Sequence, residues 1–243
     1  MTPITYRTVP FSHGWLWIRL AFRMYRRKPL MWIAYATAIV IIGALLTLIP
    51  IVGAFVFQLI APVLNGGMML ACHDERRLQP LQFNRLFSAF SSHGSQLVTV
   101  GGIYLTGMLL VFTGPSMMGS DPVIHLLYSG LNTPQALQQL QQLPLTPSAG
   151  LVLGLSLLLF IVMLMAYWFA PALVVLGNQR AIDAMKLSFS ACAANFPAFF
   201  LYGVIMFILL LLATIPAMLG FLIVIPIGFI NYYISYKDVF RHR

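Results

Sequence analysis

Long apolar runs, interrupted by short polar stretches, fill most of the sequence. A transmembrane α-helix needs about 20 mainly apolar residues, and six runs approach or exceed that length. They cover residues 30–49, 51–71, 96–113, 148–176, 198–215 and 219–236. Only short turns separate the first run from the second and the fifth from the sixth. We therefore predict an all-α integral membrane protein with six transmembrane helices, arranged as three hairpins.

A short amphipathic segment precedes each hairpin, at residues 12–28, 80–92 and 179–195. In the second and third segments apolar residues recur at helical spacing, at Phe83, Phe87 and Phe90 and at Ile182, Met185, Phe189 and Cys192. We predict that each segment is a cytosolic helix lying in the membrane interface. Three such units are parallel repeats, unlike the inverted repeats of many secondary transporters.

The first amphipathic segment combines a basic and an aromatic stripe. On a helix of 3.6 residues per turn, an arc of roughly 100° holds Arg19, Arg23, Arg26 and Arg27. The arc beside it holds Trp15, Ile18, Phe22 and Tyr25. With Trp15 and Lys28, the arginines are candidate ligands for an anionic lipid headgroup or for a partner's acidic face. The alternative, which we favour at this point, is simple anchoring and orientation of the chain.

The distribution of charge predicts the topology. The chain has a net charge of +9, from 14 Lys and Arg against 5 Asp and Glu. All 14 basic residues lie near the termini or in the second-to-third and fourth-to-fifth connections, so we expect both termini in the cytosol. Basic residues between apolar runs meet headgroups, so we expect membrane lipid, anionic in charge, as a partner and no nucleic acid.

Residues 114–147 form the one long connection, in which Asp121 is the sole charged residue. Proline follows Asp121 and Thr133, which predicts the starts of two short helices. This outer loop is a candidate surface for a partner membrane protein. The next run, 148–176, is longer than a vertical span needs, so it should tilt, kink at Pro171 or project beyond the bilayer.

Few residues suggest chemistry. Cys72, His73, Asp74 and Glu75 are metal-ligand types, but four adjacent residues cannot all face one ion, so we interpret them as the solvated charged end of a span. The five histidines show no nucleophile–base pattern and are interpreted as isolated surface residues. No catalytic, cofactor-binding or metal site is predicted, and no disulfide is expected between Cys72 and Cys192.

No Asp, Glu, Lys, Arg or His lies inside the predicted spans. Ion-coupled transporters place such a group near the membrane midplane, so this absence argues against ion coupling. The polar residues that remain are Gln58, Asn65 and Asn231. They could line a pathway, but we favour hydrogen bonds between helices.

Several short motifs resemble an uncharacterised family of proteobacterial integral membrane proteins. They are Gly14-Trp15, Ala61-Pro62, Gly66-Gly67-Met68, Ala71-Cys72, Leu86 to Phe90, Ala170-Pro171, Ser188 and Asn195. More distantly, the helix from Ser188 to Asn195 is similar to the membrane domains attached to some glycerophosphodiester phosphodiesterases, although this chain has no such catalytic domain. The resemblance implies the helical fold and a bacterial inner-membrane location, and no catalytic residue.

Three functions remain open. The first is a non-enzymatic inner-membrane protein, acting as an accessory or scaffold subunit or as a lipid-binding component. The second is a permease or flippase for an apolar or amphiphilic solute, which would use the proline-bearing spans and Asn65. An enzyme acting within the membrane comes third, because no nucleophile, base and oxyanion donors converge in the sequence.

Overall fold

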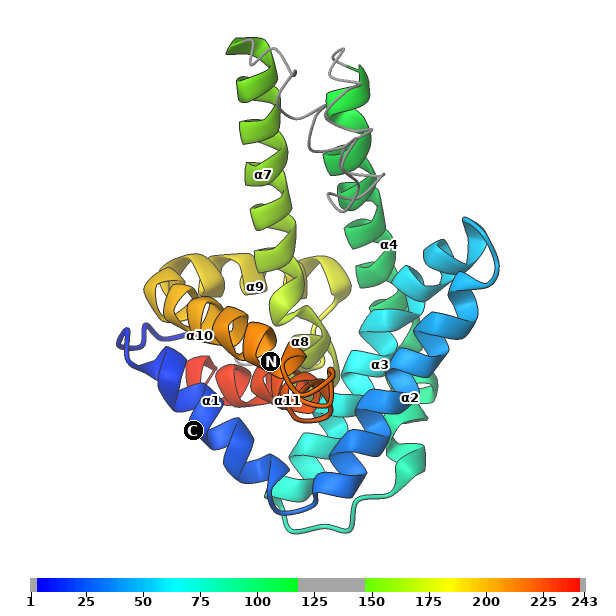
Figure 1. Cartoon of the computed structure of the whole chain (residues 1–243), viewed down its shortest axis with the longest axis vertical. Coiled ribbons are helices and arrows are strands. Elements are labelled where there is room, and N and C mark those ends of the chain that lie inside the picture. Colours follow the sequence, from blue (N-terminus) through cyan, green and yellow to red (C-terminus); the bar gives the residue numbers. More distant parts are fainter. Residues whose placement is uncertain (1–3, 118–146, 241–243) are drawn as a thin grey trace. The chain divides into compact units, whose positions relative to one another are not determined.

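Figure 1 shows a computed structural model of the chain, which describes residues 4–117 and 147–240. Every regular element in this part of the chain is helical. The helices are α1 (His13–Tyr25), α2 (Pro29–Thr47), α3 (Val52–Arg76), η1 (Phe83–Phe87), α4 (Ser88–Met117), α7 (Pro147–Trp168), α8 (Ala170–Gly177), α9 (Ala181–Ala194), α10 (Phe196–Thr214) and α11 (Phe221–Val239). The two short helices predicted after Asp121 and Thr133 lie outside the described residues.

Five helical stretches are long and apolar enough to cross a membrane. They are Pro29–Thr47, Val52–Arg76, Phe83–Thr113, Gly150–Gly177 and Phe196–Thr214, which overlap the first five predicted runs. The sixth run, in α11, is not among them. Its second half contains Asn231, Ser235, Lys237 and Asp238, and the first two are fully buried. The polar half of α11 therefore faces protein, which is why its composition departs from that of a lipid-facing helix.

The chain forms two compact units, residues 1–102 with 165–243 and residues 103–164. The larger unit is built around α11, which packs against α1, α2, α3, α8 and α10. Figure 1 shows α1 and α2 on different sides of α11. In the smaller unit, α4 and α7 meet at Gly107, where a side chain would collide with Met163.

Two of the long helical stretches are interrupted. In α4 the backbone of His93 leaves helical geometry, with φ −138° and ψ 16°, so the turn before it is set off from the span. Between α7 and α8 the break falls at Phe169, two residues before Pro171. Proline has no N–H to donate to the carbonyl four residues earlier, so the break lies where the sequence predicts a kink.

Each amphipathic helix contacts the rest of the protein through only part of its predicted apolar stripe or through residues beside it. Trp15 and Phe22 of α1 are exposed, and its buried stripe is Gly14, Trp17, Ile18, Ala21, Met24 and Tyr25. The same holds around η1, where Phe83, Phe87 and Phe90 are exposed and Leu86 and Ala89 are buried. In α9, Ile182 and Phe189 are exposed, whereas Ala181, Ala184 and Ala191 are buried. Small residues in these buried stripes allow close helix approach, and part of the larger apolar side chains stays exposed.

Candidate functional site: the exposed face of α1 and the groups that hold it

The buried face of α1 docks on α10 and α11. At Gly14 the helix comes so close to α10 that a side chain would meet the Ala198 carbonyl and the Tyr202 amide. Trp17 is fully buried beside them, with its ring centroid 5.0 Å from that of Phe199. The close backbone contact at Gly14 and the burial of Trp17 together fix the position of α1 against α10.

Asp238, in the last turn of α11, is the polar centre of this contact. Its Oδ2 accepts a hydrogen bond from Trp17 Nε1 at 2.8 Å and lies 2.6 Å from His13 Nδ1. Arg7 pairs with the other carboxylate oxygen, and Arg7 Nε donates to the Asp238 backbone carbonyl at 2.8 Å. We call Arg7, His13, Trp17 and Asp238 the clasp. The interpretation of His13 as an isolated surface residue was wrong, because it faces a carboxylate that the sequence places 225 positions away.

The electrostatics of the clasp favour a charged Asp238. Partial burial on its own raises the pKa of the carboxyl group, but hydrogen bonds from His13, Trp17 and Arg7 outweigh it and hold the pKa below its usual value of 3.8. Asp238 is therefore an anion at neutral pH, and the clasp stabilises the fold in that state.

The segment before α1 is strapped across two other helices. The backbone N–H of Arg7 donates to the Val239 carbonyl at 3.0 Å, and the N–H of Val9 donates to Asn195 Oδ1 at 2.7 Å. The fully buried Asn195 amide donates in turn to the carbonyls of Arg7 and Ala191. Asn195, one of the residues that carry the family resemblance, thus joins the N-terminal segment to the end of α9.

A second set of ion pairs lies at the end of α3. Glu75 pairs with Lys28 at 3.0 Å, and Asp74 pairs with Arg85 at 2.6 Å. Both acids are buried, so the interpretation of residues 72–75 as a solvated end was wrong. These pairs tie α3 to η1 and to the α1–α2 junction. Lys28 is consequently engaged inside the protein, unlike the arginines with which the sequence groups it.

The arginine face of α1 is left exposed. Arg19 and Arg23 of α1, and Arg26 and Arg27 in the turn that follows it, are exposed, and within the described residues no carboxylate pairs with them. Trp15, 53% exposed, and Phe22, 43% exposed, border the same face. The Arg26 guanidinium carbon lies 5.9 Å above the centre of the Phe22 ring, within cation–π range. We call these six residues the arginine face.

The polar residues of the predicted spans do not form one cluster. Asn65 Nδ2 donates to the Tyr167 hydroxyl at 2.8 Å, which joins α3 to α7. Asn231 is fully buried near the Tyr202 hydroxyl, and its amide has no hydrogen bond of good geometry among the described residues. Gln58 is half-buried. No hydrogen bond joins these three side chains to one another in the part of the chain that the structure describes.

Ser188 forms hydrogen bonds to backbone groups at the break between α7 and α8. Its hydroxyl accepts from the Phe169 N–H at 2.9 Å and donates to the Met165 carbonyl at 2.7 Å, and its side chain is fully buried. In a continuous helix these two backbone groups would bond to each other, and at the break the Ser188 hydroxyl bridges them instead. This role accounts for a serine on the buried face of α9.

Replacing Ser188 by alanine should therefore destabilise the protein. Two buried backbone groups lose their partner, which costs about 2 kcal/mol of unfolding free energy. The matched control is Ser190→Ala, since Ser190 is exposed and bonds only to Lys186 of its own helix. Thermal melting in mild detergent should place Ser188→Ala several degrees below both wild type and the control. Equal melting of the two variants would contradict the role given to Ser188.

The described residues offer no metal centre. They contain no group of three or more His, Cys, Asp or Glu side chains placed to hold an ion. Cys72 and Cys192 are both buried free thiols. Burial raises the pKa of the Cys192 thiol far above its usual value, so it stays protonated at neutral pH.

The sequence predicted no role for three residues of the clasp, Arg7, Trp17 and Asp238. One signal pointed to Asp238, because a carboxylate is scarce in a chain with 5 acidic residues and 14 basic ones. Trp17 could have been found from the stripe of Gly14, Ala21 and Met24, which has helical spacing around it.

Five helices of membrane-crossing length and composition make this chain a transmembrane protein. The chain is similar to a probable inner membrane protein of Burkholderia thailandensis, with 27% identity over 206 residues, which cover 82% of this chain and 73% of that protein. No family model matches the sequence, and no solved structure matches it. The relative agrees with the expected inner-membrane location, whereas nothing in these comparisons relates the chain to glycerophosphodiester phosphodiesterases.

Proposed function

We propose that the protein is a non-enzymatic component of the bacterial inner membrane that binds anionic lipid through the arginine face of α1. One observation carries this proposal. Four exposed arginines lack a carboxylate partner in the described residues, and two exposed aromatic rings border them. In this reading the protein acts as an accessory or scaffold subunit whose attachment to lipid is set by α1.

The physical chemistry of the arginine face suits a phosphate-bearing headgroup. Guanidinium groups donate two parallel hydrogen bonds to a phosphate, and tryptophan and phenylalanine insert at the headgroup level. Each basic residue near an anionic membrane surface contributes about 1 kcal/mol, so four arginines supply roughly 4 kcal/mol. Simple anchoring would need positive charges near the membrane. It would not need the arginines to share one face or to lack carboxylate partners.

The topology belongs to the same proposal. We place α11 as a sixth span whose polar half is shielded by α1 and α3, so that the chain forms three hairpins with both termini in the cytosol. Burial of Asn231 and Ser235 supports this placement, because polar groups inside a span face protein. The arginine face then lies on the cytosolic side, where anionic lipid attracts basic residues.

The permease or flippase alternative has less support. The Asn65 amide is engaged with Tyr167, which is the interhelical role that polar span residues commonly fill. Residues 114–147 stay a candidate surface for a partner membrane protein and lie almost entirely outside the described part of the chain.

A double substitution tests the lipid proposal. In the full-length protein, Arg19→Gln with Arg23→Gln should weaken binding of phosphatidylglycerol by about 30-fold, because two residues of about 1 kcal/mol each are lost. Binding is measured by native mass spectrometry while the lipid is titrated into the detergent-solubilised protein. Phosphatidylcholine, which has no net charge, should bind weakly to both forms.

The matched control is Arg180→Gln with Lys186→Gln, which removes the exposed basic residue just before α9 and another within it. It should change phosphatidylglycerol binding by less than threefold. If the two double variants lose binding equally, the effect reflects net charge and the arginine face is not the site. Unchanged binding in the α1 variant would also refute the proposal.

A further inference from the structure

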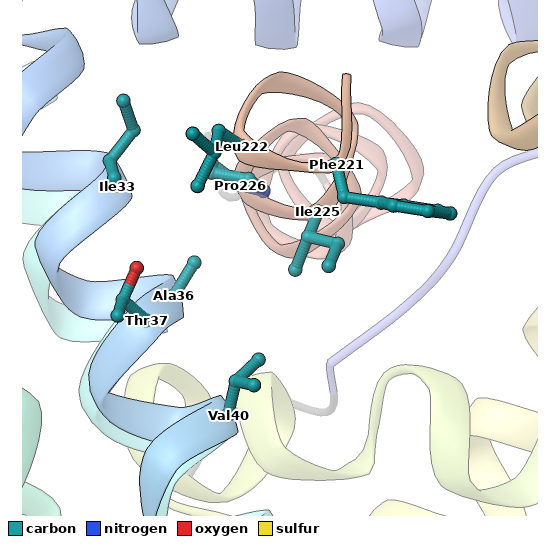
Figure 2. A pocket seen from close by; sticks show the side chains of 8 residues that line it. All are labelled: Ile33, Ala36, Thr37, Val40, Phe221, Leu222, Ile225 and Pro226. Atoms are coloured by element: carbon teal, nitrogen blue, oxygen red, sulfur yellow. The ribbon is translucent and has the colours of Figure 1, made fainter. Parts of the chain in front are cut away.

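A pocket of about 250 Å³ opens between α2 and α11. Figure 2 shows one wall carried by α2 and the other by α11. The lining residues are Ile33, Ala36, Thr37 and Val40 from α2 and Phe221, Leu222, Ile225 and Pro226 from α11. The four α2 positions follow the spacing of one helix face, so the pocket runs along the helix over nearly two turns.

The lining is almost entirely hydrocarbon. Thr37 is the sole polar side chain in it. The hydroxyls of Thr47, Thr99 and Thr214 donate to carbonyls of their own helices, whereas that of Thr37 has no hydrogen bond in the described residues. A bound water needs two to four polar partners, and one hydroxyl cannot provide them. The pocket is therefore unsuited to water or to a polar ligand.

The position of the pocket on a membrane-crossing helix indicates an apolar ligand. α2 is one of the helices able to cross a membrane, and residues 33–40 lie in its middle. Val40 is 50% exposed and Leu222 is 46% exposed, so the pocket opens on the outer surface of both helices. At that depth the surrounding material is lipid hydrocarbon. The volume is below that of pockets for drug-sized ligands, and it suits a single chain.

We propose that the α2–α11 pocket holds one hydrocarbon chain of a tightly retained membrane lipid. The chain fills the space between two helices that are far apart in sequence and completes their contact. This site is separate from the arginine face, since the two share no residue, and either can fail without the other.

Two neighbouring positions of α2 give a matched test. Val40 lines the pocket, and Ile41, which is 51% exposed, does not. Val40→Phe fills the pocket with a ring, whereas Ile41→Phe adds the same ring outside it. Native mass spectrometry of protein extracted gently from its own membrane, followed by lipid analysis, should find retained lipid on wild type and Ile41→Phe. We expect at least fivefold less on Val40→Phe when both variants also carry Arg19→Gln with Arg23→Gln, so that lipid bound by the arginine face does not contribute. Thermal melting checks that both variants fold.

Two further variants separate the possible ligands. Thr37→Val keeps the shape and removes the hydroxyl, so retention of a hydrocarbon chain should stay within twofold of wild type. A large loss in Thr37→Val would instead indicate a ligand that binds by hydrogen bonds and would overturn the proposal. Arg19→Gln with Arg23→Gln should leave this lipid in place. Loss of it only in the arginine variant, equal retention in Val40→Phe and Ile41→Phe, or no retained lipid on wild type would each refute the pocket site.

Discussion

Asp238→Asn is expected to lower the melting temperature of the detergent-solubilised protein by roughly 6–12 °C. The substitution removes the anion that Arg7, His13 and Trp17 share, and it leaves their donors facing a neutral amide. Losing one member of a buried charged cluster costs 3–5 kcal/mol, and we expect about 3 because the Arg7 side chain is 38% exposed. Tryptophan emission in the same melt, to which Trp17 contributes together with the other three tryptophans of the chain, should follow the same transition.

The control for Asp238 is Asp183→Asn. Asp183 is an exposed carboxylate of α9 that has no ion pair in the described residues, so its loss should change the melting temperature by a degree or less. The pH dependence gives a second check. Because the folded pKa of Asp238 lies below 3.8, its contribution is present above that pH and is lost as the pH falls through the folded value. The stability difference between wild type and Asp238→Asn should therefore begin to shrink below about pH 4 and disappear only when the pH is below the folded pKa. A constant difference across that range would show that the carboxylate charge is not what matters.

Gly67→Ala should be as damaging as the loss of the clasp. A methyl group at this position of α3 would collide with the backbone carbonyl of Leu86, and backbone cannot move aside as a flexible side chain can. η1 would have to shift away, which strains the nearby pair between Asp74 and Arg85. Overpacking of this kind costs about 3 kcal/mol, visible as a lower melting temperature and a lower yield of folded protein.

Gly203→Ala is the control for Gly67→Ala. Gly203 also lies inside a helix, α10, but nothing stands within 4 Å of a side chain built there. Alanine is the better helix former by about 1 kcal/mol, so Gly203→Ala should match or exceed wild-type stability. If Gly67→Ala and Gly203→Ala had the same melting temperature, α3 and η1 would not be in the tight contact described above.

Much of the helical layout could be predicted from the sequence, because long apolar runs report directly on membrane-crossing helices. The break near Pro171 followed from the missing proline N–H. The sixth run was harder, since hydropathy cannot tell a polar residue buried against protein from one facing water, and α11 carries several of the first kind. The kink at His93 falls in the gap between the predicted amphipathic segment 80–92 and the predicted span 96–113, and the Gly94-Ser95 pair beside it is of the kind found at helix kinks.

The candidate site was predicted only in part. The arginines of α1 and of the turn after it are exposed, as predicted for an amphipathic helix. The helix docks through Trp17 and its small neighbours, whereas Trp15 is exposed. Lys28, grouped with the arginines by sequence, pairs with Glu75. Such pairings depend on contacts between distant parts of the chain, and periodicity within one helix carries no information about them. For the same reason, the contacts of Asp238 with His13 and Arg7 could not be predicted from the sequence.

The clasp joins α1 and the segment before it to α11, which the ribosome makes more than 200 residues later. Translation at about 5–20 residues per second produces α1 on the order of ten seconds or more before α10 and α11, its docking partners. During that interval Trp17, Ile18 and Met24 have nothing of their own chain to cover them. A ribosome that stalled or stopped before the last helix would leave this apolar stripe open. Synthesis of α11 is thus the step that covers the docking face of α1 and closes this part of the fold.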